Sequence, residues 1–245
     1  MNGESACLYP HDERAGGGST APVRSFCVAV LYTVGHSIRP LPELIGILQE
    51  AGVARLADVR RIPRSRRHPQ FNVDTLPASL AAAGIEYVHM PALGGRRGAR
   101  QGHASRNTLW RVEAFRNYAD YAETPPFQEA LARLDALAAE RPTAIMCAEA
   151  LWWQCHRRLI TDYMLARGWD IIHLMAPGQR QNAVLTPGAA PQRDGTIAYP
   201  GERSRDRLPW DEATDATDRL DATDHTDATD CTDATDCTDY TDHKD

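Results

Sequence analysis

Short apolar runs alternate with segments of helical periodicity between residues 25 and 190, and this alternation constrains the fold more than any other feature. Five runs are typical of strands, at residues 26–34, 54–59, 85–90, 143–147 and 169–175. The segments between them space their apolar residues three and four positions apart, as in Leu41, Leu44 and Leu48. Strands that alternate with helices predict a mostly parallel sheet with helices on both faces. We therefore expect a single three-layer α/β domain with about five strands.

Cap and stop signals bound the predicted helices. Gly52 and Gly84 end helices that begin near residues 41 and 74, and Thr124-Pro125 begins another with proline at its first position. Two further helices are predicted at residues 109–121 and 155–167. The run at 143–147 is apolar on both faces, which indicates a central strand of a parallel sheet.

The two ends of the chain differ in composition from the middle. Residues 1–24 are glycine-rich near their end, and the segment 191–245 turns into a repeat in which Thr-Asp recurs every third position. The whole chain has a net charge of −6, but residues 211–245 hold thirteen acidic residues against two basic ones and leave residues 1–210 at +5. Such a repeat has almost nothing apolar to bury. We expect a flexible leader at 1–24, a domain at 25–190 and a disordered acidic tail at 191–245.

Several classes of protein are excluded by the sequence. The longest apolar run, residues 26–34, is far shorter than the roughly 20 residues that span a bilayer. The first residues do not follow the pattern of a signal peptide. Six cysteines, two of them in the tail, do not form a disulfide framework in a chain of 245 residues. We expect a cytoplasmic protein in a reducing compartment, without a membrane partner.

Polar and glycine residues follow four of the predicted strands at the point where each strand ends. The carboxyl ends of parallel strands share one edge of the sheet, where open α/β folds bind their ligands. The sequence therefore predicts a ligand site at this edge. The residues expected to bind the ligand are Gly35, His36, Ser37, Arg60, Ser65, Arg66, Gly94, Gly95, Arg96 and Arg157.

Arginines dominate the loops at this edge, at residues 60–67 and 96–106. Guanidinium groups bind phosphate or carboxylate with paired hydrogen bonds. The glycine-rich phosphate-binding motifs GxxxxGK[ST] and GxGxxG are absent. The loops thus indicate either a phosphate-bearing small molecule, a nucleic-acid strand, or a solvated surface without a ligand.

The segment 146–158 holds the residue types best suited to catalysis. The catalytic candidates are Cys147, Glu149, Cys155 and His156, together with Asp58. A thiol in the first turn of a helix, beside histidine and arginine, has a lowered pKa. It can serve as a nucleophile, as a redox partner of the second cysteine or as a soft metal ligand. Because Cys-x7-Cys-His is not a familiar zinc spacing, no metal site is predicted.

Two tryptophans, Trp152 and Trp153, lie in the same segment. Aromatic side chains beside basic loops stack on nucleic-acid bases. They equally pack a loop against its own domain. The sequence leaves both interpretations open.

The chain from about residue 32 to 187 resembles the bacterial family called domain of unknown function 488. Five stretches in order carry the resemblance: VGHSIRPLPELIGIL, DVRRIPRSRRHPQFN, GIEYVHMPALGGRR, FRNYADYAETPPF and IMCAEALWWQCHRRLI. The resemblance implies that the residues matching the family's motifs are Gly35, His36, Ser37, Asp58, Arg60, Pro63, Ser65, Arg66, Gln70, Phe71, Asn72, Leu93, Gly94, Gly95, Cys147, Ala148, Glu149, Cys155, His156 and Arg157. The family has no established activity, so the resemblance implies no reaction.

Three functions follow from these patterns. The favoured hypothesis is an enzyme that acts on a phosphate-bearing substrate, a nucleotide or a nucleic acid, with cysteine and acid–base groups. The first alternative is a nucleic-acid-binding module without catalysis that uses the arginine-rich loops. The second is a Cys/His metal site or a thiol-redox site. The sequence assigns neither a cofactor nor an oligomeric state.

Overall fold

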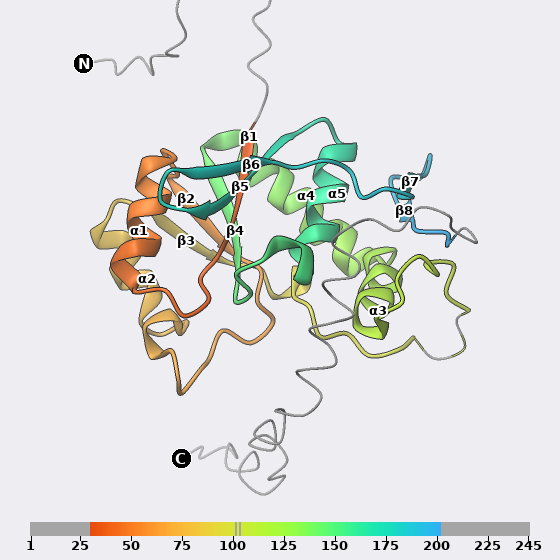
Figure 1. The fold of residues 1–245 in the computed structure, drawn as a ribbon, viewed down its shortest axis with the longest axis horizontal. Coiled ribbons are helices and arrows are strands. Elements are labelled where there is room, and N and C mark those ends of the chain that lie inside the picture. The colour runs from red at the N-terminus through yellow and green to blue at the C-terminus, as the bar shows by residue number, and fades with distance from the viewer. Residues whose placement is uncertain (1–29, 101, 103, 202–245) are drawn as a thin grey trace, which may run out of the picture.

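Six strands form the main sheet of the computed structural model, which describes residues 30–100, 102 and 104–201 (Figure 1). The strands are β1 (Val30–Gly35), β2 (Arg55–Asp58), β3 (Glu86–His89), β4 (Thr143–Cys147), β5 (Asp170–Ala176) and β6 (Gln179–Asn182). Their order across the sheet is β3-β2-β4-β1-β5-β6. All pairs are parallel except β5 with β6. The predicted α/β sheet is therefore confirmed, with β4 in its interior.

The register of the parallel strands aligns their carboxyl ends. Gly35 of β1 lies opposite Cys147 of β4, and Asp58 of β2 lies opposite both Met146 and His89. The segments that follow β1, β2, β3 and β4 consequently begin at the same edge of the sheet. This is the edge at which the sequence predicts the ligand site.

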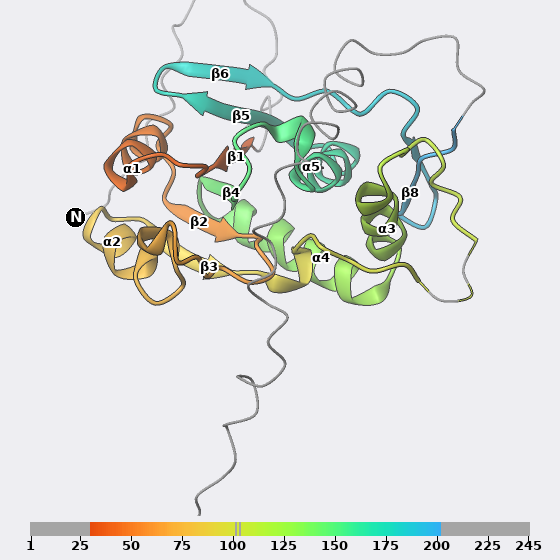
Figure 2. The same ribbon diagram turned by 60° about the horizontal axis from the view of Figure 1, so that its bottom comes forward.

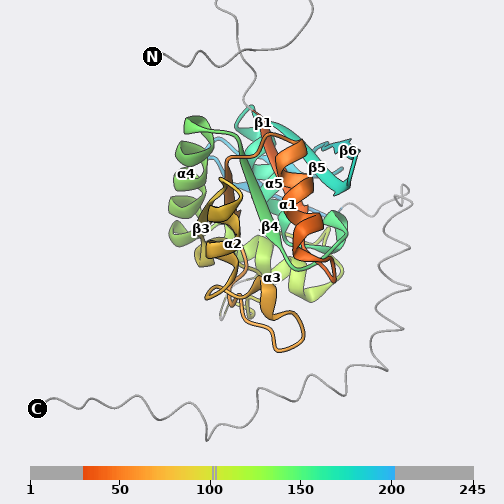
Figure 3. The same ribbon diagram turned by 90° about the vertical axis from the view of Figure 1, so that its left-hand side faces the viewer.

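Helices cover both faces of the sheet, as Figure 3 shows. They are α1 (Leu41–Glu50), α2 (Leu76–Ala82), α3 (Glu113–Ala122), α4 (Pro125–Glu140) and α5 (Arg157–Ala166). Alternate residues of β4 enter two separate cores: Ala144 and Met146 pack with α1 and α2, whereas Ile145 and Cys147 pack with α4 and α5. This two-residue alternation produces the three layers.

Strand β6 was not predicted because its sequence, QRQN, is polar and exposed throughout. It pairs with β5 as a hairpin at the edge of the sheet (Figure 2). Gly178 in the connecting turn has a φ of +69°, a conformation that glycine adopts without strain. An edge strand buries neither face here, so no hydrophobic period marks it in the sequence.

The folded domain continues past residue 190, the predicted boundary with the tail. A short second sheet joins β7 (Ala190–Pro191) and β8 (Ile197–Ala198). Ile197 and Tyr199 are fully buried in the core that contains α4 and α5. The Tyr199 hydroxyl also donates to Asp162 Oδ2 at 3.0 Å. The leader 1–24 and the repeats beyond residue 201 lie outside the described residues.

Three short 3-10 helices complete the fold: η1 (Pro69–Phe71), η2 (Pro91–Leu93) and η3 (Trp152–Gln154). Because η3 occupies residues 152–154, α5 begins at Arg157 rather than at the predicted residue 155. In the part of the chain that the structure describes, no helix has the length and apolar character required to cross a membrane.

Candidate functional site

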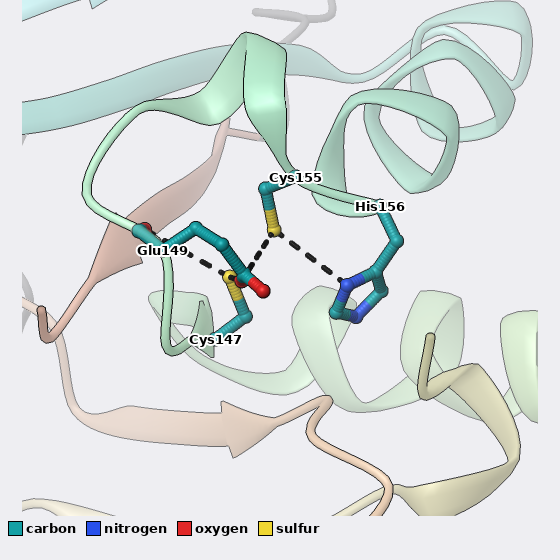
Figure 4. A group of neighbouring side chains, drawn as sticks. All are labelled: Cys147, Glu149, Cys155 and His156. Carbon is teal, nitrogen blue, oxygen red and sulfur yellow. Dashed lines mark hydrogen bonds between the residues drawn. The ribbon is translucent and has the colours of Figure 1, made fainter. Parts of the chain in front are cut away.

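Four side chains converge where β4 ends and α5 begins, and we call them the Cys-Glu-Cys-His cluster. They are Cys147, Glu149, Cys155 and His156 (Figure 4). Cys147 is the last residue of β4, Cys155 follows η3 and His156 caps α5. One donor atom from each side chain lies within 4.8 Å of all the others. The loop 148–154 folds back and brings Cys155 and His156 beside Cys147 at the end of β4 (Figure 4).

The Glu149 carboxylate lies between the two sulfurs. Its Oε2 atom is 2.7 Å from Cys147 Sγ and 3.2 Å from Cys155 Sγ. His156 Nδ1 lies 3.6 Å from Cys155 Sγ, and the other ring nitrogen, Nε2, lies 3.1 Å from the Val59 carbonyl oxygen. Since a carbonyl only accepts hydrogen bonds, Nε2 carries a proton and donates it to Val59.

Arg157 supports the cluster from the core and is only 2% exposed. Its backbone N–H and its Nε–H each donate to Cys155 Sγ at 3.4 Å, and its Nη2 donates to the Glu149 carbonyl oxygen at 2.7 Å. Gly35 permits this packing, because a Cβ there would overlap that carbonyl oxygen and lie 2.9 Å from Arg157 Nη2. Gly35 and Arg157 thus fix the position of the Glu149 backbone on the core side of the cluster.

The surroundings shift the pKa values of the two thiols in opposite directions. Burial opposes ionisation of Cys155, but the contact with Cys147 and the charges of His156 and Arg157 outweigh it and lower the pKa of this thiol well below its usual value. Burial and the neighbouring Cys155 raise the pKa of the Cys147 thiol. Burial likewise raises the pKa of the Glu149 carboxyl, as does the charge of Cys155. Cys155 is therefore the thiolate of the pair.

A cleft of about 510 Å³ lies beside the cluster at the carboxyl edge of the sheet. Glu149 and His156 form part of its wall, whereas neither sulfur does. Cys147 is fully buried and Cys155 is 1% exposed. A molecule in the cleft consequently meets the carboxylate and the imidazole, and the two sulfurs lie behind them.

The predicted residues Asp58, Arg60 and His36 form a buried network next to the cleft. Arg60 Nη2 lies 2.6 Å from Asp58 Oδ2, and Arg60 Nη1 donates to His36 Nε2 at 3.1 Å. Tyr87 also donates its hydroxyl to Asp58 Oδ2 at 2.8 Å. Burial lowers the pKa of His36 to about 4, so the imidazole is neutral at pH 7 and accepts from Arg60. Asp58 is fully buried and holds Arg60 in the cleft wall.

The cleft brings together about half of the residues that the sequence singled out. Those that line it are His36, Arg60, Ser65, Gly95, Arg96, Glu149 and His156. Those that lie outside its wall are Gly35, Ser37, Asp58, Arg66, Gly94, Cys147, Cys155 and Arg157. Gly94 has a spacing role similar to that of Gly35, because a Cβ there would lie 2.6 Å from the backbone nitrogen of Arg61.

Helix α3 contributes two aromatic wall residues that sequence reasoning missed, Phe115 and Tyr118. The Tyr118 ring packs edge-on against His156, with centroids 5.3 Å apart. Its hydroxyl donates to the Leu93 carbonyl oxygen at 2.6 Å. An aromatic residue on an amphipathic helix is typical of the core, so the sequence carried no signal for this position.

Trp152 packs its loop against the domain and is not a stacking surface for bases. It is 9% exposed and stacks on His173, with ring centroids 4.5 Å apart. Its Nε1–H donates to Gln181 Oε1 at 3.1 Å. Of the two interpretations left open by the sequence, the structure supports the packing role for Trp152.

A second hollow of about 330 Å³ shares Arg61 with the main cleft. It is lined by Arg61, Arg97, Gly98, Arg100, Asn117, Tyr121 and Thr124. The Arg97 guanidinium lies 3.7 Å from the centroid of the Tyr121 ring. Within the described ranges, no carboxylate forms an ion pair with Arg61, Arg96, Arg97 or Arg100. The two hollows are thus adjacent at Arg61, and each has several arginines in its wall.

Comparison with known proteins agrees with the resemblance seen in the sequence. A family model described as a domain of unknown function, DUF488, matches residues 40–164. The chain belongs to this family. The DUF488 match includes the whole Cys-Glu-Cys-His cluster as well as Asp58 and Arg60, and it begins after His36. The search of curated proteins and the search of solved structures each find no match to the chain.

Proposed function

We propose that the protein is an enzyme that acts on a phosphate-bearing substrate bound in the cleft. One observation carries this proposal: the Cys-Glu-Cys-His cluster opens, through Glu149 and His156, onto a cleft whose wall is rich in arginine. Clusters of titratable groups with perturbed pKa values in a cleft are typical of active sites. The arginines specify the charge of the ligand, and the cluster supplies the reacting groups.

The substrate's phosphate is bound by the arginines of the cleft that form no ion pair with a described carboxylate. Arg61 and Arg96 line the cleft, and no described carboxylate pairs with either of them. Arg64 is 3.8 Å from Asp74, and both side chains are 70% exposed, so this ion pair contributes little. Arg60 instead is ion-paired with Asp58 and also donates to His36 and to the Phe71 carbonyl oxygen, so its charge is balanced within the protein.

The aromatic wall favours a nucleotide over inorganic phosphate or a sugar phosphate. Phe115 is half-buried and lines the same cleft as the arginines, whereas Tyr118 is 1% exposed and supports the wall from behind. A planar base gains stacking energy on such side chains, about 1–3 kcal/mol per base. A cleft of about 510 Å³ is within the range of small-molecule sites, which measure roughly 300–1,000 Å³.

Glu149 and His156 are the members of the cluster that face the substrate, and Glu149 is the one we expect to transfer a proton. It is an exposed residue whose carboxyl group lies between the sulfurs and the cleft. Burial raises the pKa of this carboxyl above its usual value, which suits a group that moves a proton. Loss of a general acid or base lowers a rate by about 100- to 10,000-fold.

A variant pair tests the proposal. The full chain is incubated with a panel of ribonucleotides, deoxyribonucleotides and short oligonucleotides, and products are detected by mass spectrometry. We expect one substrate class to be converted, and Glu149→Gln to lower the rate by about 100-fold or more. Glu129→Gln, an exposed position on α4, serves as the control and keeps the wild-type rate. Equal rates in the two variants, or no conversion of any nucleotide, would overturn the proposal.

A second candidate, a nucleic-acid-binding module without catalysis, is favoured by the second hollow. That hollow holds Arg61, Arg97 and Arg100 but no member of the cluster, so it serves binding alone. Affinity for a single-stranded oligonucleotide would then fall with salt, with a slope of about −0.7 per phosphate contact. Arg100→Gln reduces this slope and Arg133→Gln, on the exposed side of α4, does not. Tight binding without conversion would favour this candidate, and absence of binding would exclude it.

A further inference from the structure

We propose that Cys147, Glu149, Cys155 and His156 bind one divalent transition-metal ion, with Zn²⁺ the best match. The site uses the same cluster as the proposed enzyme, but its test needs no substrate. Two thiol sulfurs, one imidazole nitrogen and one carboxylate oxygen lie within 4.8 Å of one another. Sulfur and nitrogen donors in a set of four are typical of zinc sites.

Three of the six donor–donor separations lie within about 1 Å of those of a tetrahedral site, and all six are within 4.8 Å. With metal–donor bonds of about 2.0–2.3 Å, tetrahedral geometry separates the donors by roughly 3.3–3.8 Å. Cys155 Sγ and His156 Nδ1 are 3.6 Å apart. The Glu149 oxygen is 3.2 Å from one sulfur and 2.7 Å from the other, so this side chain must withdraw by under about 1 Å.

The hydrogen bond of His156 fixes the ring in the orientation that a ligand needs. Nε2 donates to the Val59 carbonyl oxygen at 3.1 Å, which turns Nδ1 toward the sulfurs. Metal-binding histidines usually donate their second ring nitrogen to a carbonyl or carboxylate in this way. Tyr118 packs against the edge of the ring, and Gly95 lies so close that a Cβ there would be 3.0 Å from Nδ1. The ring is therefore held before any ion binds.

Arg157 places a buried positive charge directly behind the cluster, where it can balance the charge of the ligands. It is 2% exposed, and in the described part of the chain no carboxylate oxygen lies within ion-pair distance of its guanidinium. A buried charge is stable only when it is compensated. Its N–H groups donate to Cys155 Sγ, as they would to a thiolate. Two thiolates and one carboxylate around a divalent ion leave a single negative charge, which Arg157 neutralises.

The exposure of the ligands distinguishes a catalytic site from a structural one. Both cysteines are buried, whereas Glu149 faces the cleft. A carboxylate that a substrate or water can displace leaves an open coordination position, which is the feature of catalytic zinc sites. The buried sulfurs are then ligands, which explains why neither of them lines the cleft.

Cobalt substitution tests the site directly. The full chain is stripped with a chelator and titrated with Co²⁺, which reports tetrahedral thiolate coordination through intense visible bands and a near-ultraviolet charge-transfer band. We expect saturation at one ion per chain. Cys147→Ser and Cys155→Ser each weaken binding by at least about 100-fold, beyond the 10- to 100-fold effect of outer residues. The double variant Cys231→Ser/Cys237→Ser, in the tail, keeps the spectrum of the wild type.

The result is decisive even if a cysteine variant fails to fold. Glu149→Ala changes an exposed residue, and we expect it to keep the charge-transfer band while changing the visible bands. A wild-type chain that shows no thiolate band with Co²⁺, or a band that depends only on the tail cysteines, would overturn the proposal. Conversion of nucleotides by a protein without metal would leave the proposed enzyme intact, and metal binding without conversion would leave the metal site intact.

Discussion

The substitution Gly35→Ala probes the tightest packing beside the cluster. Its Cβ would overlap the Glu149 carbonyl oxygen and approach Arg157 Nη2 to 2.9 Å. Overpacking of this kind costs about 1–3 kcal/mol. Displacement of the carbonyl also stretches its 2.7 Å hydrogen bond from Arg157, and bonds to charged groups contribute about 1.5–3 kcal/mol. After the gain of about 0.5–1 kcal/mol from removing a glycine from a strand, we expect a net loss of about 1.5–5.5 kcal/mol.

Urea denaturation followed by circular dichroism measures this loss. Gly46→Ala is the matched control, because Gly46 lies on the exposed side of α1 and a Cβ there meets no atom within 4 Å. We expect the control to raise the free energy of unfolding by about 0.5–1 kcal/mol. If Gly35→Ala proves as stable as the wild type, the close approach of β1 to the loop 148–150 is not what holds the cluster together.

Three further predictions concern acid stability, ring orientation and metal removal. Burial raises the pKa of Asp162 from 3.8 to about 6, so the wild type loses stability as pH rises through that window. We expect the stability of Asp162→Asn relative to the wild type to increase by about 2 kcal/mol from pH 4 to pH 7, and a pH-independent difference would contradict this. Gly95→Ala places a Cβ 3.0 Å from His156 Nδ1 and should weaken Co²⁺ binding by about 10- to 100-fold. Gly98→Ala is the control, because its Cβ meets no atom within 4 Å, and it should leave the affinity for Co²⁺ unchanged. Chelation should lower the melting temperature of the wild type and leave that of Cys155→Ser unchanged, and equal shifts in both would argue against the site.

The strands were predictable because each carries its own signal, an apolar run of limited length. All five predicted strands are present, and the first is described from Val30 onward. The missed elements carry no such signal: β6 is polar throughout, and β8 has two residues. Local sequence patterns likewise do not predict the order of the strands in the sheet. Strand β4 lies between β2 and β1, and this order depends on contacts between residues far apart in the chain.

The cluster was predictable in membership but not in geometry. Cys147, Glu149, Cys155 and His156 lie within ten positions, and their residue types indicated chemistry. The spacing of the cysteines predicted no metal site. Spacing along the chain does not show that the segment with η3 brings Cys155 back beside Cys147, so that the four donor atoms lie within 4.8 Å of one another. Burial of both sulfurs behind Glu149 depends on packing from other elements.

The role of the arginines depended on partners that the sequence does not identify. Arg60 and Arg61 are neighbours with the same chemistry, yet Arg60 is bound to Asp58 and His36 whereas Arg61 faces both hollows. The hydrogen bonds to Asp58, to His36 and to the Phe71 carbonyl oxygen hold Arg60 inward. Loop composition therefore indicated that arginines lie at this edge, but not which of them pair with groups of the protein itself.

A native mass spectrum of the full chain, purified without oxygen or chelator and compared with the same sample after denaturation, tests the central claim most directly. That claim is that the Cys-Glu-Cys-His cluster is a metal-binding reactive centre. We expect the native mass to exceed the denatured mass by one divalent metal ion per chain, with the denatured chain fully reduced. A denatured mass about two units low, from a disulfide, or a native chain without bound metal would contradict the account.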